Sequence, residues 1–179
     1  MIRLKEFSVE EIIGFINDGD NVKETFVVND QKYKVGLSSL RLLCFKRSLV
    51  CVSCGRIGNL FALEKSVEKD ITPHFNLYHK DDKEEILMTQ DHIFPKSKGG
   101  AHCLENLQTM CFKCNHKKGN AINEGYIDVL LSLIKSLIDQ KYTDNQISNI
   151  LANSETKKII GFNPLMSDMC SIIRQLSNL

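Results

Sequence analysis

Two identical Cys-x-x-Cys units constrain this chain more than any other feature. The first is CVSC, with Cys51 and Cys54, and the second is CFKC, with Cys111 and Cys114. Two such units can place four thiolates around one tetrahedral zinc ion at about 2.3 Å each. The 56 residues between the pairs, 55–110, exceed the gap of a usual zinc ribbon, so the fold itself must bring them together. Four protein ligands leave no open position for water, and zinc held in this way would be structural.

Other uses of the cysteines are less favoured. A chain with seven cysteines and no export signal argues against a disulfide framework. Two unrelated pairs remain an alternative, as does a redox role for one pair, although no thioredoxin-like βαβ pattern surrounds either. We expect the three remaining thiols to be buried. They are Cys44, Cys103 and Cys170.

The composition favours one globular domain in 179 residues, with 42% hydrophobic and 25% charged residues. No apolar run approaches the ~18 residues of a membrane span, and the acidic start MIRLKEFSVEE has no apolar signal region. We therefore expect a cytoplasmic protein with no membrane partner. The net charge of +1 does not itself indicate a nucleic-acid partner. The distribution of charge is more informative. Residues 41–56 contain four cations and no acid, and residues 86–120 contain five lysines and two acids.

Several local patterns predict secondary structure in the first half of the chain. Ser8 with Glu11 forms a capping-box pattern that predicts a helix from about residue 9 to 17. Two short strands are expected around Asn29-Asp30, and SSLRLLCFKRS predicts a helix capped by Ser38 or Ser39. A hairpin follows, with strands 74–79 and 85–89 around a polar tip at 80–84.

The second half alternates between short elements and then becomes helical. NLQTM predicts a short strand, and FKCNHKKGN a helix that Gly119 ends. From Glu124 on, YIDVLLSLIKSLIDQ predicts a strong amphipathic helix, and shorter helices follow to the end of the sequence. YTDNQISNILANSETKKIIGF faintly resembles the opening of a helix-turn-helix module. Its only cations, Lys157 and Lys158, precede an apolar IIGF, so support for the core or a partner surface is favoured over DNA reading.

The dipeptide Asp91-His92 stands where the predicted return strand ends and a Pro and Gly-Gly loop begins. A carboxylate oxygen is a hard ligand suited to magnesium or manganese. A neutral imidazole can accept a proton from water at neutral pH. Adjacent residues at a strand end point in different directions, so one can hold a metal while the other faces a water. Alone, such a dipeptide is usually an ordinary turn.

In its wider context, this segment resembles the HNH endonucleases, a family with a ββα-metal (His-Me finger) fold. CVSC, DHIFPKSKGG, ENLQTMC and CFKCNHKKG carry the resemblance, over about residues 45–120. They follow the family order of a cysteine pair, Asp-His with Pro and Gly-Gly, Asn-Leu, and a second cysteine pair with Asn or His and a basic residue before Gly. The long insert between Gly55 and Leu87 departs from the pattern. We interpret it as an extended connection with an extra hairpin outside the catalytic core.

The resemblance implies a role for each matching position. Asp91 and Asn115 would bind one catalytic divalent cation, Mg²⁺ or Mn²⁺, and His92 would be the general base that activates water. Asn106 would fix the loop and orient His92. Family members often have His where Asn115 stands in this chain. The amide oxygen of Asn favours magnesium over softer metals. His116 is an alternative ligand, but one position along a helix turns a side chain by about 100°. The structural Zn²⁺ would be held by Cys51, Cys54, Cys111 and Cys114.

Cations near these motifs are candidates for contacts with DNA phosphates, although for any single lysine a solvated surface position is an equal alternative. They are Lys96, Lys98, Lys113, Lys117, Lys118 and Arg47, with Arg41, Lys46 and Arg56 similar. His74 and His79 belong to one predicted strand. They could be spare metal ligands, but ordinary strand histidines are the favoured alternative. No pattern gives His102 a role.

These observations predict an α+β protein in three parts. A helix and hairpin segment at 1–40 precedes an HNH nuclease core with its zinc site at 41–122, and a helical extension follows at 123–179. The expected function is a metal-dependent endonuclease that nicks or cuts DNA, as a monomer or a homodimer. The alternative is a non-catalytic, zinc-stabilised nucleic-acid-binding module, which would need neither Asp91, His92 nor Asn115. Small nucleases of this kind resemble those of phages, mobile elements or bacterial restriction enzymes.

Overall fold

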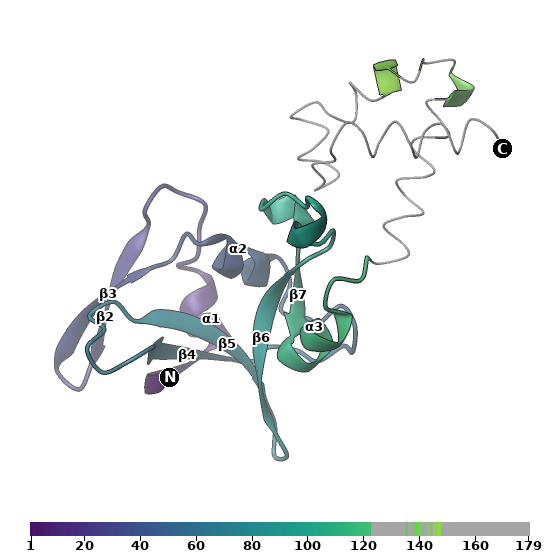
Figure 1. The fold of residues 1–179 in the computed structure, drawn as a ribbon. Helices are drawn as coiled ribbons and strands as arrows, with labels where there is room; N and C mark the ends of the chain where they lie inside the picture. Colours follow the sequence, from purple (N-terminus) through teal and green to yellow (C-terminus); the bar gives the residue numbers. More distant parts are fainter. Residues whose placement is uncertain (123–134, 136–137, 141–142, 144, 148–179) are drawn as a thin grey trace. The chain divides into compact units, whose positions relative to one another are not determined.

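The computed structural model describes residues 1–122, 135, 138–140, 143 and 145–147 (Figure 1). The chain divides into two compact units. Unit 1 contains Met1–Asp91 and Gln108–Lys118, and unit 2 contains His92–Leu107 and Gly119–Leu179. Most of the predicted helix at 126–140 lies outside the described residues, as do Cys170, Lys157, Lys158 and the helices expected after residue 148.

A five-stranded sheet, in the order β1-β4-β5-β6-β7, organises the described chain. β1 pairs antiparallel with β4, and β4 with β5, whereas β5 pairs with β6 only from Tyr78 to Lys80. The C-terminal half of β6, which includes Asp91, therefore lies beyond its pairing with β5. The strands are β1 (Ile2–Ser8), β4 (Leu60–Lys65), β5 (His74–Lys80), β6 (Glu85–His92) and β7 (Leu107–Cys111).

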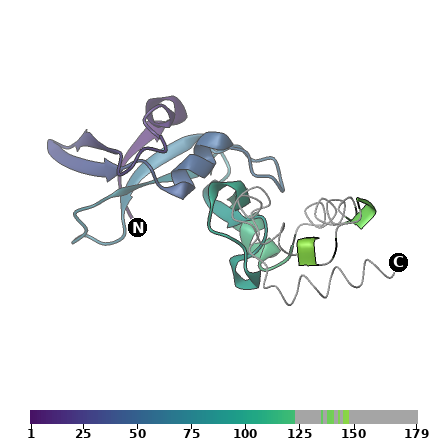
Figure 2. The ribbon, with the colours of Figure 1, turned by 90° about the horizontal axis from the view of Figure 1, so that it is seen from above.

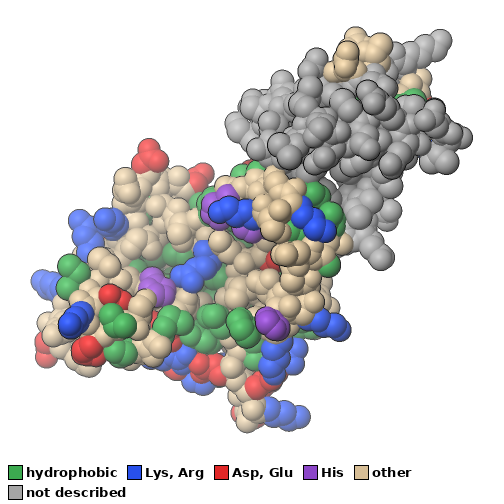
Figure 3. All heavy atoms as spheres, in the orientation of Figure 1, with side chains coloured by type: hydrophobic (Ala, Val, Ile, Leu, Met, Phe, Trp, Pro, Cys, Tyr) green, Lys and Arg blue, Asp and Glu red, His purple; other side chains and the backbone are tan. Residues whose placement is uncertain are grey.

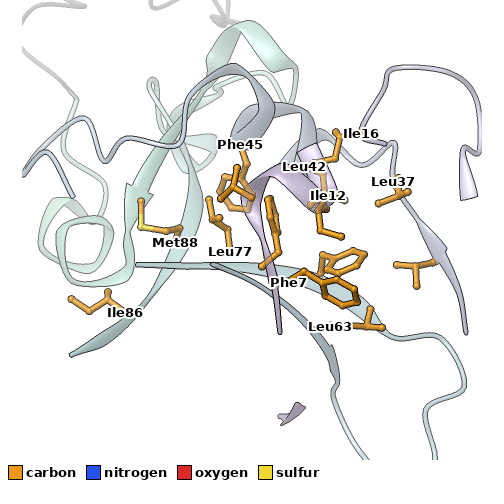
Figure 4. Packing of buried hydrophobic residues seen from close by; sticks show 14 of the residues in the cluster. Phe7, Ile12, Ile16, Leu37, Leu42, Phe45, Leu63, Leu77, Ile86 and Met88 are labelled. Carbon is orange, nitrogen blue, oxygen red and sulfur yellow. The ribbon is translucent and has the colours of Figure 1, made fainter. Parts of the chain in front are cut away.

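Two short helices cover one face of the sheet in unit 1 (Figures 1 and 2). They are α1 (Val9–Ile13) and α2 (Leu40–Arg47). Figure 4 shows Phe45 of α2 next to Leu77 of β5 and Ile12 of α1 next to Phe7, and Ile12, Phe45 and Leu77 are fully buried. Each side chain of this size contributes about 1.5–3 kcal/mol when removed from water. This core fixes the sheet to which the second half of the chain is attached.

A separate two-stranded ribbon joins the two helices. β2 (Lys23–Val28) and β3 (Gln31–Gly36) pair over their whole length around Asn29 and Asp30. Both turn residues have positive φ, 50° and 63°, which is the backbone of a type I′ hairpin. The ribbon is anchored by Phe26, whose ring meets that of Phe75 edge to face at 5.0 Å. The predicted strands around Asn29-Asp30 are confirmed.

The segment that carries the candidate site has the element order β6, β7 and α3 (Phe112–Lys118). The predicted hairpin, short strand and helix are present here, and Gly119 ends the helix with a φ of 52°. In the sequence between β6 and β7, unit 2 contains two short 3₁₀ helices, η1 (Lys96–Lys98) and η2 (Leu104–Asn106). The order ββα agrees with the expectation, and the mixed α/β architecture is established. A ββα-metal core in the family's sense stays a proposal.

Some elements differ from their predictions. The capping box of Ser8 and Glu11 is present, but α1 ends at Ile13, four residues before the predicted end. β1 and β4 were not predicted, so the insert after Gly55 supplies an inner strand of the sheet as well as a hairpin. Cys44 is buried as expected, whereas Cys103 is only partly buried. The boundaries at residues 40 and 122 stay predictions.

Within the described residues, no helix has both the length and the apolar character to span a membrane. The few described residues beyond Gly119 include a local cap, in which the side chain of Gln146 accepts hydrogen bonds from the backbone N–H and the hydroxyl of Thr143 at 2.9 Å each. The backbone N–H of Gln146 in turn donates to that hydroxyl. This reciprocal pattern is typical of a helix start.

A polar network joins β1, β4 and β5. Glu64, which is 3% exposed, accepts hydrogen bonds from Asn76, Tyr78 and Arg3 at 2.6, 2.8 and 3.0 Å. Burial raises the pKa of the Glu64 carboxyl, but the hydrogen bonds from Asn76, Tyr78 and Arg3 outweigh burial and lower the pKa below its usual value. A carboxyl with a lowered pKa stabilises the fold above the pKa of the unfolded chain and loses this contribution as the pH falls.

Glu64→Gln is therefore expected to lower the free energy of unfolding at pH 7 by about 1–3 kcal/mol, because a charge-assisted network becomes a neutral one. The difference between the two proteins should shrink as the pH falls through the lowered pKa, since wild-type Glu64 then also becomes protonated. Urea denaturation at pH 7 and at successively lower pH measures both effects. Glu68→Gln, at an exposed turn position, is the control, and a difference independent of pH would contradict the prediction.

Candidate metal sites and catalytic residues

The four cysteines of the two Cys-x-x-Cys units come together in unit 1. Their sulfur atoms all lie within 4.8 Å of one another, and the Sγ atoms of Cys54 and Cys111 are 3.8 Å apart. Four sulfurs at 2.3 Å from a tetrahedrally bound zinc ion would be about 3.8 Å apart. The donor set and its spacing therefore fit zinc, and the predicted meeting of the two pairs is confirmed. The residues are Cys51, Cys54, Cys111 and Cys114.

Local backbone contacts explain how the first pair forms its turn. The N–H of Gly55 donates to the carbonyl of Cys51 at 2.9 Å, and Gly55 has a φ of 74°, which favours glycine. The N–H of Val52 donates to Thr109 O of β7 at 3.1 Å and so ties the turn to the strand that ends at Cys111. This contact spans a long stretch of chain and brings the two pairs together.

The thiols of this cluster differ in acidity. The backbone N–H of Arg56, together with its guanidinium 3.3 Å from the sulfur, lowers the pKa of Cys54 to about 6. Burial raises the pKa of Cys111 to about 12. Zinc binds thiolates, so Cys54, whose lowered pKa favours the thiolate, is the ligand that we expect to bind the cation first.

Asp91 lies on β6 in a polar and nearly closed environment, with only 6% of the residue exposed. Its Oδ2 atom accepts a hydrogen bond from Gln108 Nε2 of β7 at 2.7 Å. The ammonium of Lys118 contacts both carboxylate oxygens, at 3.1 Å for Oδ1 and 2.9 Å for Oδ2. Both oxygens of this buried carboxylate are therefore in contact with a donor of the protein.

Asn115 lies on the same side of α3 as Lys118, because residues three apart on a helix are neighbours. Its amide Nδ2 donates to the hydroxyl of Thr89 at 2.9 Å, and that hydroxyl donates its proton to Met110 O at 2.9 Å. Since the Thr89 proton is already used, the hydroxyl can only accept from Asn115. This chain of bonds fixes the Asn115 amide with its nitrogen on Thr89 and its oxygen available for another partner.

The two candidate oxygen ligands therefore come from facing elements of unit 1. Thr89 and Asp91 are two residues apart and therefore lie on the same side of β6. α3 lies along that side, where Asn115 contacts Thr89 and Lys118 contacts Asp91. A carboxylate oxygen and an amide oxygen are hard donors that fit Mg²⁺ or Mn²⁺. Neither His116, which is exposed with its ring stacked on Phe112, nor His74 belongs to this arrangement.

In unit 2, Asn106 organises the loop that follows β6. It is fully buried, and its side chain accepts from Phe94 N at 2.9 Å and donates to Phe94 O and Ala101 O at 3.0 and 2.8 Å. Gly100 lies so close to Phe94 O that a Cβ atom at this position would collide with the backbone. These contacts explain why the loop requires Gly100 and a buried amide. That Asn106 also orients His92 stays a prediction.

His92 is half-buried in unit 2, and the structure gives it a partner that the sequence did not indicate. Its Nε2 atom lies 3.1 Å from Nδ1 of His102, and the two rings are 5.2 Å apart. His102 occupies an irregular loop, where no periodicity predicts a neighbour. Gln108 and Thr89 were also missed, although Thr89 stands two residues before Asp91 and strand alternation places both on one side.

The predicted DNA-contacting cations fall into two groups. Lys96, Lys98, Lys117 and Arg47 are exposed. Lys113 and Lys118 instead pair with carboxylates, Lys113 with Glu84 at 2.5 Å and Lys118 with Asp91. In the view of Figure 3, side chains of both signs are interspersed over unit 1.

Comparison with known families identifies part of the chain. Residues 79–130 match the family model described as HNH endonuclease. The match includes the end of β5, all of β6, the loop with His92 and Asn106, β7 and α3. The match begins after the first cysteine pair. That pair lies outside the matched segment in sequence but clusters with Cys111 and Cys114, which lie within it. Neither the curated proteins nor the solved structures yielded a match.

Proposed function

We propose that this protein is a metal-dependent HNH endonuclease that hydrolyses phosphodiester bonds of DNA. One observation carries the proposal. Within the segment that matches the HNH family, Asp91 and Asn115 lie on facing elements, and each is held by a side-chain hydrogen bond, from Gln108 to Asp91 and from Asn115 to Thr89. The other residues that the family pattern requires, His92 and Asn106, are in the same matched segment.

The hard oxygen donors of Asp91 and Asn115 support Mg²⁺ or Mn²⁺ as the catalytic cofactor, with zinc on the four cysteines as a structural one. A divalent cation bound at the oxygens would neutralise charge on the phosphate and on the leaving oxygen. Lys118 is the resident counter-ion of Asp91. Its ammonium must share the carboxylate with an incoming cation or move away from it toward a phosphate.

His92 supplies the base. A water oxygen forms a bond to phosphorus, the water proton passes to a ring nitrogen of His92, and the ester P–O bond breaks while the leaving oxygen takes a proton from solvent. A neutral imidazole has the pKa that suits this transfer near neutral pH. Asn106 contributes by fixing the backbone of the loop on which His92 stands.

Duplex DNA is the proposed substrate, bound through its phosphates by the exposed cations. Each phosphate contact that is lost should reduce the slope of log K against log salt by about 0.9. A single site of this type cuts one strand at a time, so we propose nicking by one chain. Cleavage of both strands would take a homodimer or a second encounter.

Conversion of supercoiled plasmid to the nicked form tests the proposal. The zinc-loaded protein, dialysed free of other divalent ions, should act only after Mg²⁺ or Mn²⁺ is added. Dialysis is preferable to a chelator here, because a chelator would also attack the cysteine site. Asp91→Asn should abolish nicking, whereas Asp82→Asn, at an exposed turn position, should not. A protein that shifts DNA but never nicks plasmid, branched or RNA substrates would be the non-catalytic binding module instead.

Thr89→Val tests the orientation of the Asn115 amide. Valine keeps the shape of threonine but offers no acceptor to Asn115 Nδ2, so the amide can rotate and present nitrogen to the metal. We expect Mn²⁺ affinity, measured by titration calorimetry, to fall about 10- to 100-fold, as for other groups that orient metal ligands. Thr89→Ser should retain the affinity, and Thr25→Val on β2 is the matched control. Unchanged affinity in Thr89→Val would contradict the assigned orientation.

A further inference from the structure

We propose that His102 is a positioning residue that holds the ring of His92 in the tautomer that a general base requires. The inference deepens the proposed function and rests on it. It starts from the separation of 3.1 Å between His92 Nε2 and His102 Nδ1, a hydrogen-bonding distance between two ring nitrogens. Among the described residues of unit 2, these are the two histidines of the loop between β6 and β7.

Two neutral imidazoles can form this bond in only two ways. If His102 Nδ1 carried the proton, His92 Nε2 would accept it, and the remaining proton of neutral His92 would sit on Nδ1. His92 would then have no lone pair to take a proton from water. If His92 Nε2 carries the proton and His102 Nδ1 accepts it, the lone pair of His92 lies on Nδ1. Only the second arrangement leaves a base.

The same bond also serves after proton transfer. Once Nδ1 of His92 has taken the water proton, the ring is an imidazolium whose Nε2–H still points at a neutral acceptor. His102 Nδ1 then stabilises the positive charge in the way that the carboxylate of a Ser-His-Asp triad does, but without a formal negative charge. Its effect should accordingly be smaller than the ~10⁴-fold attributed to that carboxylate.

The position of His102 in the fold supports a built contact. Ala101, immediately before it, is held by Asn106, whose amide donates to Ala101 O at 2.8 Å, and Gly100 is pressed against Phe94 O. The backbone that carries His102 is thus tied to the backbone just after His92.

Three variants distinguish the hydrogen bond that His102 makes to His92 from the volume that its side chain fills. His102→Leu removes the acceptor, whereas His102→Asn places an amide oxygen near the position of Nδ1. Glu105→Ala, at an exposed position of the same loop, is the matched control. We expect His102→Leu to lower kcat for plasmid nicking about 10- to 100-fold with an unchanged Kd for DNA measured without divalent ions. His102→Asn should recover most of the rate, and Glu105→Ala should equal the wild type.

A measurement that needs no cleavage accompanies the kinetics. In zinc-loaded, ¹⁵N-labelled protein, a scalar coupling between His92 Nε2 and His102 Nδ1 should be present across the N–H···N bond, with the proton on His92. It should vanish in His102→Leu. Full activity of His102→Leu, or a wild-type protein with no such coupling, would overturn the inference while leaving the nuclease intact. A wild-type protein that cleaves no substrate would overturn both the nuclease function and the positioning role of His102. If the coupling were nevertheless present in that inactive wild type, the histidine pair would be structural.

Discussion

Replacement of His92 by alanine is expected to reduce the rate of plasmid nicking by about 10²- to 10⁴-fold, the usual contribution of a positioned general base. Binding should not change with it, because His92 is neutral when it acts and makes no phosphate contact in the proposal. The Kd for a duplex, measured without divalent ions, should therefore stay within about twofold of the wild type. The zinc content and the melting temperature should also match.

The control for this variant is His74→Ala, which removes a half-buried strand histidine that could otherwise be imagined as a spare ligand. It should cut at the wild-type rate. Added imidazole should restore part of the activity of His92→Ala, since a small base can enter the space that the side chain has left. Cleavage by His92→Ala at the wild-type rate would exclude His92 as the base and point to a contaminating nuclease.

Loss of the zinc proposed for the four-cysteine cluster is expected to have the largest effect on stability. A ligand that binds only the folded state at 1,000 times its Kd stabilises it by about 4 kcal/mol. For a chain of this size, such a loss lowers the melting temperature by about 8–16 °C. Cys111→Ser should show this shift together with loss of bound zinc, because Cys111 is fully buried and serves both β7 and the cluster.

Cys103→Ser provides the comparison, as its thiol lies outside the four-cysteine cluster. That variant should keep one zinc ion per chain and the melting temperature of the wild type. Exposure to a strong chelator should reproduce the Cys111→Ser phenotype in the wild type. Equal melting temperatures with and without zinc would show that the cluster does not hold the fold together.

The sequence predicted the parts of the fold whose signal is local. The capping box at Ser8, the turn at Asn29-Asp30 and the spacing within each cysteine pair each depend on a few neighbouring residues, and each is present. β1 and β4 gave no such signal. Their pairing, with partners such as Phe7 and Phe61, joins residues more than 50 positions apart. β1 has a single buried residue, Phe7, so its strand conformation depends on pairing with β4, which no short window of sequence contains.

The candidate site shows the same division. Asp91, His92 and Asn115 could be proposed because their residue types and order carry chemistry, whereas their contacting partners could not be predicted. Gln108, Thr89 and His102 are polar residues of common types, and they gain meaning only through what they contact. The pairing of Lys118 with Asp91 was likewise unexpected, because a lysine in a basic helix resembles any other phosphate contact.

The hydrogen bond between Asp91 and Gln108 has a consequence for how such a chain can change over evolutionary time. These two residues stand at the points where the chain leaves unit 1 and returns to it, so their side chains, 2.7 Å apart, close the 16-residue excursion 92–107 at its base. The cost of closing a loop rises by only about 0.6 kcal/mol for each doubling of its length. Insertions at its exposed positions 96–99 could therefore accumulate while the contact between Asp91 and Gln108 is retained.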